Sequence, residues 1–192
     1  MIKIGKNISE FSVYSCQPKT KKELKEIIKE RINKEGPKCD LNDIDTSLIT
    51  NMSYLFFDSK FNGDISEWDV SNVIDMNVMF AYSRFDGDIS KWDVSKVRNM
   101  TGMFTYAEFN KSIEDWDVNN VKEMSGMFER SEFNQDISKW DTSNVKNMSY
   151  TFFRAKFNQD ISKWKININC NTNDMFNECP IKEEYKPKLS QS

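Results

Sequence analysis

The sequence predicts an α/β repeat solenoid, a stack of 24-residue coils that each hold a short parallel strand and a short helix. Three observations predict this fold class. Tryptophan recurs every 24 residues, several other apolar columns keep the same register, and a small polar residue precedes an apolar run at helical spacing in each copy. Because a unit this short cannot bury its own apolar face, the copies are expected to stack and share one core.

The period is clearest in tryptophan, which stands at Trp68, Trp92, Trp116, Trp140 and Trp164. Columns of phenylalanine, isoleucine, valine and methionine repeat in the same register without an insertion. Aromatic and methionine side chains at fixed positions are typical of a packed interior. The expected shared core includes Ile65, Trp68, Val73, Met76, Phe80, Ile89, Trp92, Met100, Phe104, Trp116, Phe128, Trp140, Phe152 and Trp164.

Each coil is expected to run from a turn through a strand to a capped helix. Asn62 and Gly63 mark a turn, and Trp68 and Val70 then alternate with polar residues as in a strand over residues 64–70. Ser71 precedes an apolar run at i, i+3 and i+7, so we interpret it as the N-cap of a helix of two to three turns. The same position holds Ser47, Ser95, Asn119, Ser143 and Asn167 in the other units. Period and element order resemble the leucine-rich-repeat class.

Three regions are expected along the chain. Residues 1–36 form an N-terminal segment, residues 37–180 a six-unit solenoid with degenerate end units, and residues 181–192 a C-terminal tail. Thr20 and Glu23 fit a capping box, and Leu24 and Ile28 follow at helical spacing, which predicts a helix over about residues 21–34. We expect this helix to cover one open end of the core. The alternative, which its lysines suggest, is a helix that binds a membrane surface or a partner.

Composition excludes several classes of function. The chain has no histidine, which rules out histidine-based triads and mixed Cys/His zinc sites, and no glycine-rich phosphate loop or nucleophile motif is present. We therefore expect no enzyme activity, no catalytic residues, no metal and no cofactor. The cysteines are expected to be reduced thiols. No apolar run is long enough to span a bilayer and residues 1–15 lack a continuous hydrophobic segment, so we expect a cytoplasmic protein.

The repeat array is acidic although the whole chain carries a charge of only −3. Residues 37–180 hold 15 Lys or Arg against 23 Asp or Glu, which argues against contact with a phosphate backbone. Aspartate fills two columns, one through Asp64 and Asp88 and another through Asp69 and Asp93. We expect each carboxylate to accept backbone amides at a turn; the alternative is that calcium neutralises the stacked charges.

The unit FNQDISKWDTSNVKNMS at residues 133–149 resembles the repeat of the BspA-like family of bacterial leucine-rich-repeat surface proteins. That family is also known as a domain of unknown function in mycoplasma and firmicute proteins. The resemblance covers about three quarters of the chain. It implies a non-enzymatic repeat scaffold, which in relatives is often displayed on the cell surface and linked to adhesion.

We expect a protein–protein interaction scaffold that acts as a monomer and binds another protein. Specificity is expected where solvent-facing columns change between coils. This candidate surface comprises Ser66, Glu67, Ser90, Lys91, Glu114, Asp115, Ser138, Lys139, Ser162 and Lys163 on the strand side and Tyr82, Arg84, Tyr106 and Arg130 in loops. Two alternatives remain: an acidic decoy that inhibits a basic, nucleic-acid-binding partner, and a calcium-stabilised adhesion-type repeat.

Overall fold

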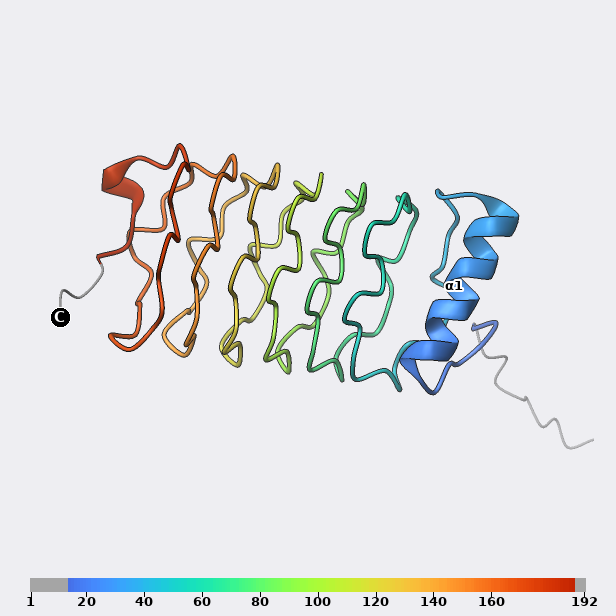
Figure 1. The fold of residues 1–192 in the computed structure, drawn as a ribbon. Coiled ribbons are helices and arrows are strands. Elements are labelled where there is room, and N and C mark those ends of the chain that lie inside the picture. Colours follow the sequence, from blue (N-terminus) through green and yellow to red (C-terminus); the bar gives the residue numbers. More distant parts are fainter. Residues whose placement is uncertain (1–13, 189–192) are drawn as a thin grey trace, which may run out of the picture.

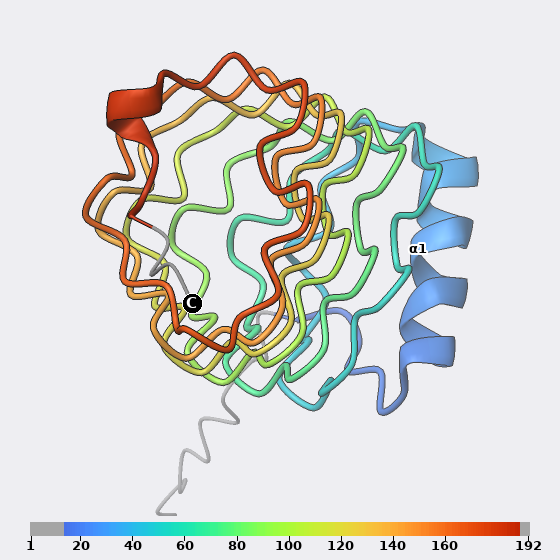
Figure 2. The same ribbon diagram turned by 60° about the vertical axis from the view of Figure 1, so that its left-hand side comes forward.

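The computed structural model describes residues 14–188 as a stack of coils with one helix across its N-terminal end (Figure 1). Helix α1 spans Lys21–Glu35, and a single 3-10 turn, η1, spans Glu183–Tyr185 at the other end. Viewed closer to the stack axis, equivalent segments of successive coils overlie one another (Figure 2). The regular repeat stack is therefore present.

Parallel contacts between coils are isolated bridges rather than strands within residues 14–188. One continuous row joins residues 24 apart and runs through Asn51, Asp75, Asn99, Glu123, Asn147 and Asn171. A further bridge joins Asp40 to Asp64. The regular row of parallel bridges thus lies after residues 64–70, the segment predicted as a strand. In residues 64–70 the Trp68 amide instead donates to the Ile65 carbonyl at 3.2 Å, which is a turn.

The prediction of a short helix in every coil was wrong. The run after Val73 is a ladder of turns in which alternate amides bond to the next coil, as the Phe80 amide does to the Met103 carbonyl at 2.9 Å. Between these bonds the Met79 amide donates to the Met76 carbonyl within its own coil, at 3.2 Å. Because the turns place apolar side chains three and four residues apart, they reproduce the spacing of a helical face.

The predicted N-cap column has a different role from the one expected. The Ser71 amide donates to Oδ1 of Asp69 at 3.0 Å, and the Ser95 amide does the same to Asp93. The acceptor is therefore the aspartate two residues earlier, in an Asx-turn, and no helix follows the serine. The expectation that the carboxylates accept backbone amides holds in this column.

The core consists of aromatic columns that run along the stack. Phe56, Phe80 and Phe104 stack at centroid distances of 5.4 and 5.6 Å with their rings nearly parallel, and the column continues to Phe176. Each tryptophan is only 3–4% exposed. Its indole N–H donates to a backbone carbonyl of the preceding coil, as Trp116 does to Ile89 at 3.1 Å. All fourteen residues expected in the core lie in the buried cluster.

Helix α1 closes the N-terminal end of this core, close to its predicted bounds. Thr20 Oγ1 accepts the Glu23 amide at 3.2 Å, and Gly36 ends the helix with a φ of 90°. Leu24 and Ile28 are buried among the core residues. The other lysines of α1 are exposed, whereas Lys21 Nζ reaches the first coil and donates to Ser53 Oγ at 2.9 Å.

Candidate interaction surface

The aspartate column on the predicted strand side accepts hydrogen bonds from backbone amides. The Ser66 amide donates to Asp64 Oδ1 and the Ser90 amide to Asp88 Oδ1, both at 2.9 Å. These backbone hydrogen bonds are the main cause that lowers the pKa of Asp64 and of Asp88 below the ordinary value. Ser138 and Ser162 make the same bonds to their own aspartates. The four serines predicted to be interaction residues are thus parts of structural turns.

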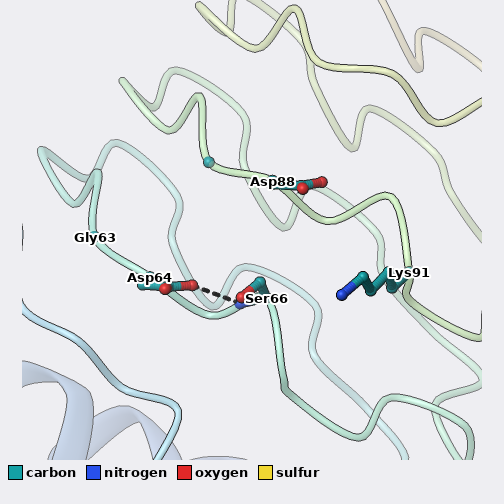
Figure 3. Close-up of a pocket in the computed structure, with 6 residues that line it drawn as sticks. Gly63, Asp64, Ser66, Asp88 and Lys91 are labelled. Atoms are coloured by element: carbon teal, nitrogen blue, oxygen red, sulfur yellow. Dashed lines mark hydrogen bonds between the residues drawn. The ribbon is translucent and has the colours of Figure 1, made fainter.

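A shallow hollow of about 220 Å³ lies between two of these turns (Figure 3). Asp64 and Asp88 line it from neighbouring coils, and Lys91 reaches across the side where Ser66 lies. The attraction of Lys91 contributes to the lowered pKa of Asp88, whereas Asp64 opposes it. The hollow therefore holds two carboxylates and one ammonium.

Some of the variable charges on this side pair between neighbouring coils. Lys139 Nζ lies 2.9 Å from Glu114 Oε1 and 3.4 Å from Asp115 Oδ1. Glu67, Lys91 and Lys163 are exposed. Ion pairs as exposed as those of Lys139 are screened by water and salt and contribute little to stability. The strand side therefore offers a mixed-charge surface without an apolar centre.

A continuous row of aromatic side chains and one arginine runs along the turn ladder, in which Arg130 and Phe153 are half-buried and the other members are exposed. We call this row the aromatic ridge, and it comprises Tyr54, Phe57, Tyr82, Tyr106, Arg130 and Phe153. Phe57 contacts Tyr82 at a centroid distance of 5.8 Å, and Tyr82 stacks on Tyr106 at 4.8 Å. The Arg130 guanidinium lies 5.2 Å from the Tyr106 ring and 5.5 Å from the Phe153 ring. The ridge thus links five consecutive coils.

The ridge is built on backbone that most side chains avoid. Tyr82, Tyr106 and Arg130 have φ values of 58°, 54° and 52°, in the left-handed region that favours glycine or asparagine. Each such residue costs about 1–2 kcal/mol. The equivalent residues Asp58, Arg154 and Glu178 have φ values of 51°, 56° and 56°, so this conformation belongs to the turn that every coil repeats.

The structure brings together three of the four loop residues predicted from the sequence. Tyr82, Tyr106 and Arg130 belong to the ridge, whereas Arg84 lies outside it, with Nε 4.0 Å from Glu108 Oε1. Sequence reasoning missed the remaining members, Tyr54, Phe57 and Phe153. The signal was present in the sequence, because Phe57 and Phe153 share a column that holds Ala81, Thr105 and Glu129 in the units between them.

Ring geometry limits what the ridge can contact. Tyr82 and Tyr106 lie only 13° from parallel, so their faces point along the stack toward each other. Arg130 occupies the other face of Tyr106. Nucleobases and sugar rings need an open aromatic face on which to stack. The facing sides of Tyr82 and Tyr106 are therefore covered by each other and by Arg130.

The described residues contain no group of three or more acidic or cysteine side chains placed to hold a metal ion. The four cysteines are free thiols, and burial raises the pKa of Cys39 and of Cys179. Within residues 14–188, no helix is both long and apolar enough to cross a bilayer.

Comparison with known families identifies the repeat. A family model described as "Mycoplasma protein of unknown function, DUF285" matches residues 23–132 and again residues 105–186. The chain belongs to the DUF285 family. The two overlapping matches cover most of the DUF285 array described above, including the turn ladders and the ridge. Searches of curated proteins and of solved structures found no match.

Proposed function

We propose that this DUF285 protein is a non-enzymatic protein–protein interaction scaffold that holds its partner along the aromatic ridge. The observation that carries the proposal is the unbroken contact of Tyr54, Phe57, Tyr82, Tyr106, Arg130 and Phe153 at the surface of a rigid stack. Tyrosine and arginine are the residue types enriched at the energetic centres of protein interfaces.

Three further features support a role in recognition. Tyr82 is 50% exposed and Tyr106 40%, so both rings are accessible to a partner. Both residues stand at the same turn position of successive coils, where the repeated positive φ fixes the placement of their rings. The unit at residues 133–149 is similar to that of the BspA-like leucine-rich-repeat surface proteins, and this resemblance implies a repeat scaffold of a kind linked in some members to adhesion.

Loss of the two ridge tyrosines tests this proposal. Asparagine tolerates a left-handed φ, so the double variant Tyr82→Asn/Tyr106→Asn removes both rings without adding backbone strain. Ile168→Asn is the matched control, because Ile168 is 67% exposed and lies outside the ridge. Each protein is immobilised and exposed to extract of its native cell, and the retained proteins are quantified by mass spectrometry.

The wild type and Ile168→Asn should retain the same partner, and the double variant should lose it. Equal retention by all three proteins would place the binding site elsewhere. Binding that collapses as salt is raised would instead favour the alternative of an acidic decoy for a basic partner.

A further inference from the structure

A groove of about 460 Å³ separates α1 from the first turn ladder. Its floor is apolar and includes Ile28, Ile32 and Leu55, while Phe57 stands at its edge with 46% of its surface exposed. Figure 1 shows α1 beside the first coil of the stack. Because Phe57 also belongs to the aromatic ridge, the groove and the ridge form one continuous surface.

Two lysines line the helix side of the groove. Lys25 and Lys29 are one helical turn apart on the same side of α1, and in the described part of the chain neither ammonium forms an ion pair. By contrast, Arg31 pairs with Asp43 at 2.9 Å. The groove has one acidic lining residue, Asp58. Its rim is therefore more basic than acidic, unlike the acidic array around it.

Backbone carbonyls of the first coil also face this end of the stack. In the second coil the Met79 carbonyl accepts the Phe56 amide and the Ala81 carbonyl accepts the Asp58 amide, both at 2.9 Å. The equivalent carbonyls of the first coil belong to Leu55 and Phe57, and they accept no hydrogen bond from residues 14–188. An occupant of the groove would meet two acceptors at the spacing of alternate residues.

We propose that this groove binds an extended acidic peptide segment of a partner protein. Backbone amides of the peptide would donate to the carbonyls of Leu55 and Phe57, which adds a partial coil to the stack. A large apolar side chain would rest against Ile32 and Phe57, and flanking Asp or Glu side chains would face Lys25 and Lys29. The inference rests on the proposed function, because it extends the partner's path from the ridge to α1.

The probe is a library of random 12-residue peptides displayed on phage and selected on the folded full-length protein. Selected peptides should combine a large apolar residue with Asp or Glu, and synthetic copies should bind the double variant Lys25→Glu/Lys29→Glu about tenfold more weakly. Lys34→Glu is the matched control. Lys34 is nine positions beyond Lys25, about half a turn round the helix, so its reversal should change affinity less than twofold.

Selection of peptides without acidic enrichment, or equal binding to all variants, would overturn the inference. Binding that survives the lysine reversal but is lost in Tyr82→Asn/Tyr106→Asn would keep the proposed function and reject the groove. If the selection yields no binding peptide, the groove is rejected as a peptide site. The extract experiment with Tyr82→Asn/Tyr106→Asn then decides the proposed function separately. A dimer in light scattering that Lys25→Glu/Lys29→Glu abolishes would also overturn the inference, because the occupant would then be a second copy.

Discussion

Replacement of Trp116 tests how the buried tryptophan column stabilises the stack. The indole is 3% exposed, and its N–H donates to the Ile89 carbonyl of the preceding coil at 3.1 Å. Trp116→Ala leaves a large cavity in the middle of the array, and we expect it to lower the free energy of unfolding by about 3–5 kcal/mol. The loss should appear as an earlier midpoint in urea unfolding followed by circular dichroism.

Trp116→Phe separates the stability contributed by the indole hydrogen bond from the stability contributed by the volume of the ring. The Ile89 carbonyl also accepts the Trp92 amide at 3.2 Å, so it keeps one partner when the indole is removed. The lost side-chain bond should cost about 1 kcal/mol and the smaller ring about 1 kcal/mol more. A Trp116→Ala loss below about 1 kcal/mol, in the range of ordinary surface substitutions, would refute the assignment of this ring to the core.

Three other substitutions test separate parts of the fold. Asp88→Ala should cost about 1 kcal/mol near pH 7, whereas Asp88→Asn keeps an acceptor for the Ser90 amide and should cost less. Because the pKa of Asp88 is lowered from 3.8, the ionised carboxylate contributes its full stabilisation above that pH and loses it as the pH falls below. In urea titrations the difference in free energy of unfolding between wild type and Asp88→Asn should therefore narrow at low pH. A difference that stays constant with pH would contradict this. Leu24→Ala should lower the free energy of unfolding by about 2–5 kcal/mol, because Leu24 is fully buried where α1 packs on the stack. The exposed control Lys22→Ala should change it by less than about 0.5 kcal/mol. Equal effects of the two substitutions would mean that α1 does not pack on the stack. Tyr106→Asn should stay within about 0.5 kcal/mol of the wild type in thermal unfolding, because relief of strain offsets the lost stacking; a larger loss would mean that the ring is structural.

The repeat and its core were predictable because burial imposes residue type at a fixed period. Trp68 and Phe80 occupy equivalent interior positions in every coil, so their columns show the stack directly. Helix α1 was predictable for a local reason, since Thr20 and Glu23 supply its cap and Leu24 begins its apolar face. In both cases the sequence pattern and the tertiary contacts favour the same structure.

The conformation of each coil was not predictable from the same patterns. Residues at i, i+3 and i+7 fit a helix, but the Phe80 amide bonds forward to Met103 in the next coil, and only the stack supplies that acceptor. The serine column looked like N-caps for a similar reason, since an Asx-turn and a helix cap use the same short polar side chains.

The candidate site was predictable only in part. Tyr82, Tyr106 and Arg130 were found because they are loop residues at solvent-facing positions that change between coils. Phe57 and Phe153 were missed because the segment that contains them was interpreted as a helix, which gives no means of placing them beside the tyrosines.

Through-hydrogen-bond NMR couplings test the central claim of stacked turn ladders most directly. In a uniformly ¹⁵N- and ¹³C-labelled sample, the Phe80 amide should couple to the Met103 carbonyl carbon, 23 residues ahead in the next coil. An intracoil helix would instead couple the Phe80 amide to the Met76 carbonyl, four residues back. Detection of the Met103 coupling is the result predicted here, and detection of the Met76 coupling would contradict it.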